Sequence, residues 1–188
     1  MSATNRRAVR READFYATPL ETIYSFLDVY DGIKDDDFIL EPSAGNGNII
    51  KALRDRDYGN LIDAVELREE ECDNLKMWAD NVYIGDFLNM SVYPTYDVII
   101  GNPPYKLAQE FVDKCLSLLR PGGRLIFLLR TNFRESKARF EWWQDKLPSG
   151  LYTLHKRPSF TGKGTDATSY SWFVWEKSDQ IKQIIKVI

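Results

Sequence analysis

The sequence predicts an α/β fold: a doubly wound, mostly parallel seven-stranded sheet with an antiparallel C-terminal hairpin. Short apolar runs alternate with amphipathic stretches along most of the chain, which is typical of strands joined by helical crossovers. Right-handed crossovers of this kind place consecutive strands in parallel. The last two apolar runs are joined by a glycine-rich loop without a helical pattern, so we expect these two strands to pair antiparallel.

Seven short apolar runs are predicted to be the strands of this sheet. They cover residues 38–40, 61–67, 82–84, 96–100, 124–129, 151–156 and 170–175. Ligands of open α/β sheets bind at the carboxyl ends of the strands, near the point where the strand order reverses. The residues that directly follow each run are therefore the first candidates for a functional site.

Five amphipathic stretches between these runs are predicted to be helices. They cover residues 20–30, 48–57, 68–79, 107–119 and 133–146. Thr18 and Pro19 precede the first stretch, which predicts Thr18 as its N-cap and Pro19 in its first turn. The fourth stretch is stopped by a Pro-Gly-Gly sequence at residues 121–123.

The length of 188 residues fits one domain, which we expect at residues 14–178, with a basic arm at 1–13 and a C-terminal tail at 179–188. No apolar run approaches the length that crosses a bilayer, and the first residues lack the apolar stretch of a signal peptide. Cys72 and Cys115 lack the paired spacing of a metal or redox motif. We therefore expect a cytoplasmic protein with free thiols, no metal site and no membrane association.

The charge is unevenly distributed along the chain, although the net charge is only −3. Between Glu21 and Asp97 there are 18 acidic and 6 basic residues, a net of −12. Between Arg130 and Lys163 there are 8 basic and 3 acidic residues, a net of +5, and aromatic residues are interleaved with them. The later segment and the four arginines at residues 6–11 favour a nucleic-acid partner that docks through its phosphates. Solvated helix faces are the alternative interpretation.

Candidate ligand-binding residues follow the first three predicted strands. Gly45 and Gly47 permit a tight turn and a close approach of backbone to ligand, but the third glycine of a dinucleotide-binding fingerprint is missing. Glu66 ends the second strand, where a carboxylate accepts hydrogen bonds from ribose hydroxyls or charges a helix N-terminus. After the third strand, Asp86 is placed to bind an adenine amine, and Phe87 to pack on the ring.

The fourth predicted strand ends in Asn102-Pro103-Pro104-Tyr105, which is the most specific pattern in the chain. Two consecutive prolines remove two backbone donors and stiffen the loop, leaving carbonyl acceptors toward the crevice. The side-chain oxygen of Asn102 adds another acceptor. Acceptors aimed at both hydrogens of an exocyclic amine favour a pyramidal nitrogen whose lone pair is free to attack. The ring of Tyr105 offers a stacking surface for a flipped base.

These motifs, in this order, make the sequence resemble the class I S-adenosylmethionine-dependent amino-methyltransferases. Within that family it is most similar to small phage-type adenine-N6 DNA methyltransferases. The resemblance extends from Asp14 to Lys177 and is carried by residues 14–19, 40–47, 66, 86–87, 102–105, 157–162 and 171–175. It implies a Rossmann-like methyltransferase fold, S-adenosyl-L-methionine as cofactor, and methyl transfer to N6 of adenine in DNA.

The resemblance also implies a role for individual residues. The cofactor would be held by Phe15, Tyr16, Thr18, Pro19, Glu41, Ser43, Ala44, Gly45, Gly47, Glu66, Asp86 and Phe87. The catalytic residues would be Asn102, Pro103, Pro104 and Tyr105. Phe160 would hold the target base together with Tyr105, and the expected basic contacts to the substrate are Arg130, Lys156, Arg157 and Lys163. His155, the single histidine, is interpreted as a structural residue or a phosphate contact.

Two departures from the family keep alternatives open. The family's usual DNA methyltransferases carry a sizeable target-recognition region, for which this chain has no room, and the chain is acidic overall. The same four-residue motif occurs in enzymes that methylate RNA adenine and a protein glutamine, and the glutamine enzymes usually carry a helical N-terminal domain that is absent here. RNA methylation and a catalytically inactive binding module remain the alternatives, and the intact motif at Asn102 disfavours the second.

Overall fold

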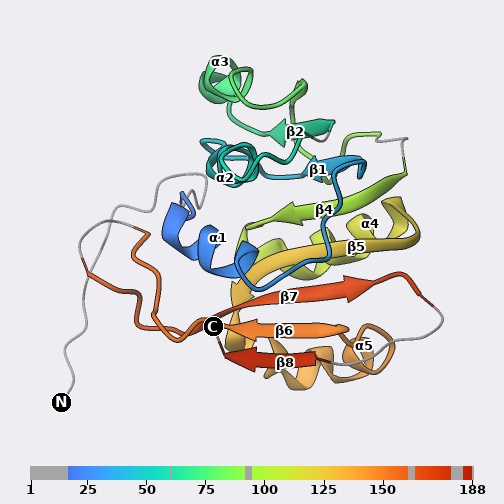
Figure 1. Cartoon of the computed structure of the whole chain (residues 1–188). Helices are drawn as coiled ribbons and strands as arrows, with labels where there is room; N and C mark the ends of the chain where they lie inside the picture. Colours follow the sequence, from blue (N-terminus) through green and yellow to red (C-terminus); the bar gives the residue numbers. More distant parts are fainter. Residues whose placement is uncertain (1–16, 60, 92–94, 161–163, 179–183, 188) are drawn as a thin grey trace.

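The computed structural model describes residues 17–59, 61–91, 95–160, 164–178 and 184–187. Within these residues eight strands form one sheet, in the order β3-β2-β1-β4-β5-β7-β6-β8 (Figure 1). The strands are β1 (Ile39–Glu41), β2 (Ile62–Glu66), β3 (Asn81–Ile84), β4 (Tyr96–Gly101), β5 (Leu119–Arg130), β6 (Gly150–Thr153), β7 (Tyr170–Glu176) and β8 (Ile184–Val187).

The pairing of the strands confirms the predicted mixed sheet. Strands β3, β2, β1, β4 and β5 are parallel to one another, and β7 runs antiparallel between β5 and β6. Strand β8 pairs parallel with β6, from Gly150 opposite Ile184 to Thr153 opposite Val187. The sequence pattern predicted seven strands and placed residues 184–187 in a tail, so β8 extends the predicted sheet by one edge strand.

The five α-helices are shorter than their predicted ranges. They are α1 (Leu20–Leu27), α2 (Asn48–Arg54), α3 (Cys72–Leu75), α4 (Ala108–Leu118) and α5 (Phe140–Asp145). Short 3-10 helices accompany them: η1 (Glu69–Glu71), η2 (Tyr105–Leu107), η3 (Thr131–Arg134) and η4 (Lys137–Arg139). The continuous helices predicted at residues 68–79 and 133–146 are therefore wrong in extent.

The interruption before α5 has an identifiable cause. The side chain of Arg139 donates from Nη2 to the carbonyl of Phe133 at 2.8 Å, an acceptor that a continuous helix would use for a backbone N–H one turn later. Ser136 has φ −160° and ψ 121°, an extended conformation that ends the helical path. The chain therefore reaches α5 through two short 3-10 helices.

Two apolar clusters fill the space on the two faces of the sheet. Ile39, Val98 and Ile100 face the cluster beneath α1 and α2, whereas Leu40 and Ile99 face the cluster beneath α4 and α5. This alternation is what the two-residue period of a strand produces when both faces are covered. Figure 1 shows the result, with α1 and α2 on one side of the sheet and α4 and α5 on the other.

The chain leaves β1 and β4 toward opposite faces of the sheet. Strand β1 is followed by α2 on one face, and the neighbouring parallel strand β4 is followed by α4 on the other. The loops at their carboxyl ends therefore diverge, which is the arrangement that opens a ligand crevice in doubly wound sheets. Both predicted motifs, at residues 42–47 and 102–105, lie at this point.

The described part of the chain offers neither a membrane span nor a cluster of metal ligands. Among the residues described, no helix combines the length and apolarity needed to cross a bilayer. Across the same ranges, His, Cys, Asp and Glu side chains do not gather in groups of three or more that could hold a metal ion. Cys72 and Cys115 are free thiols, and burial raises the pKa of the Cys115 thiol well above its usual value.

Candidate active site

The loop between β1 and α2 is a tight glycine turn tied to β2. Gly45 and Gly47 have φ values of 56° and 77°, in the left-handed region that favours glycine. The Ala44 N–H donates to the carbonyl of Val65 at 2.9 Å, and the Gly47 N–H donates to that of Ala44 at 2.8 Å. A Cβ on Gly47 would approach the Leu75 side chain to 3.1 Å, so close packing also favours glycine there.

Glu66 connects this loop to the end of β2. Its Oε2 accepts from the Gly45 N–H at 2.7 Å, while its Oε1 accepts from the backbone N–H and Nε of Arg68 at 3.0 and 2.9 Å. Arg68 also pairs with Glu71 at 3.0 Å. The carboxylate that was predicted to bind ribose therefore also fixes the position of the glycine turn.

Two polar side chains at the carboxyl end of β1 have buried oxygen atoms. Glu41 is only 2% exposed, and among the described residues its Oε2 and the Oγ of Ser43 have no hydrogen-bond partner. Burial raises the pKa of the Glu41 carboxyl well above its usual value, and the charge of Glu66 raises it further, against the backbone N–H of Ile50. Buried acceptors of this kind fit a ligand that brings N–H donors to this end of the crevice.

Asp86 and Phe87 follow β3, as predicted, but the first side chain is exposed and the second is buried. Asp86 is exposed and closes its own turn, accepting from the Leu88 N–H at 3.0 Å and from the Asn89 amide at 2.6 Å. The ring of Phe87 is 3% exposed and lies 5.2 Å from that of Phe111 in the core. In this structure the ring is buried in the core, and its packing on a bound base stays a prediction.

Exposed apolar surface is supplied instead by two residues that sequence reasoning missed. Leu67 and Ile84 are 61% and 36% exposed, and they lie at the carboxyl ends of β2 and β3, where Glu66 is the register partner of Ile84. For Leu67, the sequence signal was an apolar residue directly after Glu66, the carboxylate that ends the strand. We call the carboxyl ends of β1, β2 and β3, from Glu41 to Asp86, the cofactor edge.

Asn102 is held in place from two other segments. Its Nδ2 donates to the Oγ1 of Thr18 at 3.0 Å, and Asn48, the first residue of α2, donates to the carbonyl of Thr18 at 2.8 Å. Thr18 was predicted to cap α1, but the N-cap position is Pro19 and no side chain caps this helix. Thr18 instead holds the asparagine amide, and Asn48 is a supporting residue that the sequence did not single out.

Tyr105 belongs to a cluster of aromatic rings at the carboxyl ends of β4 and β5. Its ring lies 5.7 Å from that of Tyr170, and Phe160 lies 5.1 Å from Tyr170 on another side. The guanidinium of Arg130 lies 5.1 Å from the Tyr105 ring, and the Tyr170 hydroxyl donates to Asp166 at 3.0 Å. Burial, and then the charge of Tyr170, raise the pKa of the Tyr105 phenol above its usual range.

Sequence reasoning predicted three members of this cluster and missed Tyr170 and Asp166. We call Asn102 to Tyr105 together with Arg130, Phe160 and Tyr170 the target edge. Tyr170 is fully buried at the start of β7, so its place beside Tyr105 depends on the pairing of β7 with β5. No local motif marks it.

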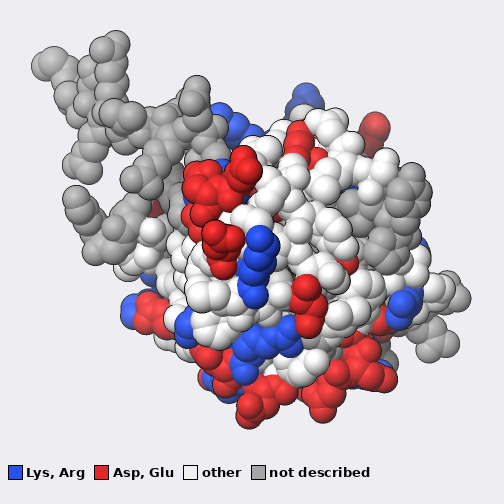
Figure 2. All heavy atoms as spheres, turned by 90° about the horizontal axis from the view of Figure 1, so that it is seen from above, with Lys and Arg blue, Asp and Glu red and all other residues white. Residues whose placement is uncertain are grey.

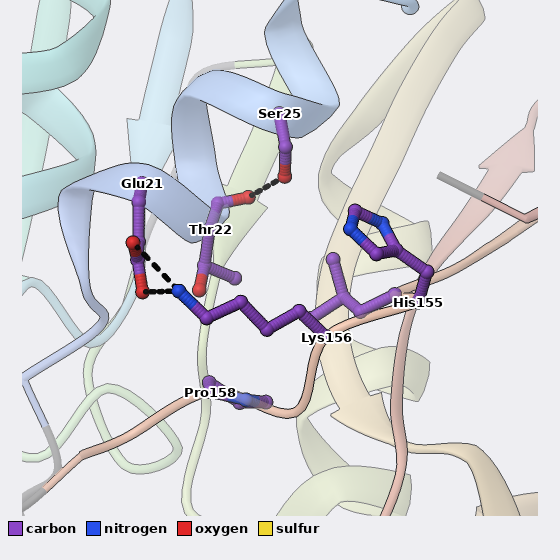
Figure 3. A pocket seen from close by; sticks show the side chains of 7 residues that line it. Glu21, Thr22, Ser25, His155, Lys156 and Pro158 are labelled. Carbon is purple, nitrogen blue, oxygen red and sulfur yellow. Dashed lines mark hydrogen bonds and ion pairs between the residues drawn. The ribbon is translucent and has the colours of Figure 1, made fainter. Parts of the chain in front are cut away.

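The remaining predicted substrate contacts lie after β6. Lys156 pairs with Glu21 of α1 at 3.3 Å, and Arg157 donates to the carbonyl of Ala167 at 3.2 Å. Figure 3 shows a pocket beside this ion pair, between α1 and the segment that includes His155 and Pro158. Phe15, Tyr16 and Lys163, which were also predicted to be site residues, lie outside the described residues.

The acidic and basic residues that the sequence indicated lie at different ends of the sheet. Exposed acidic residues on η1 and α3 include Glu69, Glu70 and Asp73. Figure 2 looks down from the side on which α3 lies, and acidic and basic groups are interspersed on this face. The predicted basic contacts Arg130, Lys156 and Arg157 lie instead at the end of β5 and after β6, next to the target edge.

Comparison with known proteins identifies the fold. No family model matches the chain. The chain is 27% identical over 124 residues to the type II methyltransferase M.TthHB8I of Thermus thermophilus, a match that covers 48% of this chain but only 28% of that protein. A Listeria monocytogenes structure assigned as a class I S-adenosylmethionine-dependent methyltransferase superposes with a TM-score of 0.68 at 14% identity, covering 90% of this chain and 65% of that one. This chain has the class I methyltransferase fold.

A second structure supports the same methyltransferase fold. A Pyrococcus horikoshii protein assigned as an RNA methyltransferase superposes with a TM-score of 0.63 at 18% identity, covering 88% of this chain and 89% of that one. S-adenosyl-L-methionine is the cofactor associated with this fold. The glycine turn, Glu66 and the loop after β3 lie at the crevice where a doubly wound sheet binds a nucleotide-like ligand.

Proposed function

We propose that this chain transfers a methyl group from S-adenosyl-L-methionine to the exocyclic N6 amine of adenine in nucleic acid, with DNA as the first candidate. The observation that carries the proposal is the position of Asn102. It follows β4 at the point where β1 and β4 diverge, beside two prolines and an aromatic cluster. An amide, a proline carbonyl and an aromatic face together suit a planar base that carries an amine.

The residues of the cofactor edge fit S-adenosylmethionine. The buried carboxyl of Glu41 and the hydroxyl of Ser43 suit the ammonium of the methionine end. Glu66 suits the ribose hydroxyls, and the exposed Leu67 and Ile84 offer apolar surface for the adenine ring. The cofactor, when bound, supplies a methyl group on a positively charged sulfur that leaves as a neutral thioether.

The residues of the target edge prepare the amine for attack. The Oδ1 of Asn102 and the carbonyl of Pro103 accept the two amine hydrogens, which draws the nitrogen lone pair out of the ring. These two acceptors would orient the nitrogen toward the methyl group that the cofactor would supply, and the surplus proton of the amine would leave to water. Preorganised acceptors of this kind act mainly by fitting the transition state, so neither a metal nor a covalent intermediate is required.

The aromatic cluster holds the base that carries the amine. The half-buried rings of Tyr105 and Phe160 offer surface to the base, and the fully buried Tyr170 packs against both of them. A base that has left its helix is stabilised by stacking worth about 1–3 kcal/mol on such a surface. Arg130, which lies over Tyr105, brings a positive charge to where the backbone phosphates of the substrate would pass.

The choice between DNA and RNA is the open part of this proposal. The Thermus relative is a type II methyltransferase, whereas the Pyrococcus structure is assigned to RNA methylation. The test incubates the purified chain with methyl-labelled S-adenosylmethionine and either duplex DNA, single-stranded DNA or RNA, followed by digestion to nucleosides. Label in N6-methyladenosine from one polymer identifies the substrate.

Two outcomes would contradict the proposal. Label at another position of a nucleoside would show a different target atom. Cofactor binding without label in any polymer would favour the alternative of an inactive binding module or an amine outside nucleic acid. The Asn102→Ala variant run in parallel separates transfer by this site from transfer by a contaminating enzyme.

A further inference from the structure

The pocket between α1 and the segment after β6 has no role in the methyl transfer described above. It is lined by Glu21, Thr22, Ser25, Leu154, His155, Lys156 and Pro158, with a volume of about 180 Å³. Figure 3 shows α1 supplying the first three side chains and the segment after β6 supplying the others. Leu154 and Pro158 are buried, so the pocket has an apolar wall and a charged rim.

Short chain segments connect both walls of the pocket to the target edge. On one wall, Glu21 follows by three residues the Thr18 hydroxyl that binds Asn102. On the other wall, Pro158 precedes by two residues the Phe160 ring that lies 5.1 Å from Tyr170. Three residues of chain span at most about 11 Å, and nucleotides of a strand follow one another at about 3.4 Å along a duplex, so a base close to the target is within reach of this pocket.

The charged rim offers an acceptor beside a donor. Lys156 Nζ lies 3.3 Å from both carboxylate oxygens of Glu21. The ammonium and the two acceptor oxygens therefore lie together at the rim of the pocket. The Glu21 carboxylate would repel a phosphate. A base edge that carries donors beside an acceptor would instead donate to Glu21 and accept from Lys156. Ser25 already donates its hydroxyl hydrogen to the Thr22 carbonyl at 3.0 Å and therefore meets a ligand as an acceptor.

Opening the ion pair for a ligand costs little. The side chains of Lys156 and Glu21 are 64% and 63% exposed. Ion pairs this exposed contribute about 0–1 kcal/mol, because water solvates both charges when they separate. The two groups can therefore turn from each other toward a base at small cost.

Resting on the proposed function, we infer that this pocket reads a guanine next to the target adenine in the same strand. Guanine is the base whose pairing edge carries two neighbouring donors, N1–H and the 2-amino group, beside the O6 acceptor. The two donors match the two oxygens of Glu21, and O6 matches the ammonium of Lys156. Cytosine, adenine, thymine and uracil each present one donor position on that edge and leave a Glu21 oxygen unmatched.

The test compares kcat/KM on oligonucleotides that differ only in the base on either side of one adenine. The bases are guanine, adenine, cytosine, thymine or uracil, and hypoxanthine, which is guanine without its 2-amino group. On one side of the adenine, guanine is expected to be preferred over hypoxanthine by roughly tenfold, the size of a hydrogen bond to a charged group. Glu21→Gln is expected to remove this difference, because an amide offers one acceptor oxygen instead of two.

A matched control is available on the same helix. Asp28 ends α1 and forms an exposed ion pair with Arg56, so Asp28→Asn also removes one surface carboxylate, but away from the pocket. It should keep the preference for guanine. Equal kcat/KM for all flanking bases, or a guanine preference that survives Glu21→Gln, would overturn the inference while leaving the proposed function intact. Absence of transfer to every oligonucleotide would overturn both.

Discussion

The cofactor edge and the target edge are built in different ways. At the cofactor edge, short loops that follow consecutive parallel strands are held by backbone groups, and Glu66 binds the Gly45 N–H and Arg68. At the target edge, four segments far apart in the sequence meet around Asn102 and Tyr105. Under the proposed function, we expect the first edge to set affinity for the cofactor and the second to set the rate and the choice of target. Variants at each edge test that division.

Asn102→Ala tests the target edge most directly. The variant loses the acceptor that holds the amine, and we expect kcat to fall by about 100- to 1,000-fold, the typical loss of one preorganised oxyanion-hole donor. Affinity for S-adenosylmethionine, measured by calorimetry, should be unchanged because the cofactor edge is intact. Asn102→Asp keeps an acceptor oxygen but loses the Nδ2 donor to Thr18, so it should retain part of the activity. Equal losses of transfer and cofactor binding would contradict this assignment.

Glu66→Gln tests the cofactor edge. An amide has a single acceptor oxygen, so it cannot serve Gly45, Arg68 and the ribose hydroxyls as the carboxylate can. We expect the Kd for S-adenosylmethionine to rise by about 10- to 100-fold, as for a hydrogen bond to a charged group, with kcat at saturating cofactor little changed. Glu71→Gln is the control, since it changes a carboxylate that pairs with Arg68 and accepts from Asn74 but not from Gly45. A similar rise in Kd for both variants would show that Arg68, rather than Glu66, controls this edge.

The cofactor edge was largely predictable from the sequence because its information is local. Two glycines after an apolar run predict the turn at Gly45 and Gly47, and Glu66 follows a buried strand within a few residues. The same holds for the motif that begins at Asn102. Phe87 is the exception at this edge. The sequence predicts that Phe87 follows β3. It does not predict that the ring is buried against Phe111, because that contact depends on the packing of α4.

The target edge was predictable only where a motif marked it. Tyr170 lies beside Tyr105 because β7 inserts between β5 and β6, and no pattern at residue 170 records that pairing. The contact of Thr18 with Asn102 spans 84 residues, and Thr18 resembled an ordinary helix cap in the sequence. Strand β8 was missed because a four-residue strand gives too short an apolar pattern to distinguish from a tail.

Thr18→Val tests whether the target edge depends on support from outside its motif. Valine keeps the shape of threonine and removes the oxygen that accepts from Asn102 Nδ2. We expect kcat to fall by roughly threefold to tenfold, the value of one neutral hydrogen bond, with the KM for nucleic acid nearly unchanged. Thr18→Ser keeps the hydroxyl and should restore most of kcat. If serine and valine lower kcat equally, the residue acts through packing and not through the amide.

Glu41→Gln tests the cofactor edge through the free energy of unfolding, which is measured without cofactor or substrate. Burial, reinforced by Glu66, raises the pKa of the folded-state Glu41 carboxyl above its ordinary value of 4.5, so the folded protein keeps this proton when the unfolded chain has released it. The unfolded state then binds fewer protons, and the free energy of unfolding of the wild type must fall as pH rises above about 4.5. Glutamine is neutral in both states and escapes this loss. In denaturant titrations, the free energy of unfolding of the variant should therefore rise relative to that of the wild type between pH 4 and pH 8, by on the order of 1 kcal/mol. A difference that stays constant with pH would mean that Glu41 is already ionised in the fold, and that the cofactor edge binds its ligand with a full negative charge at β1.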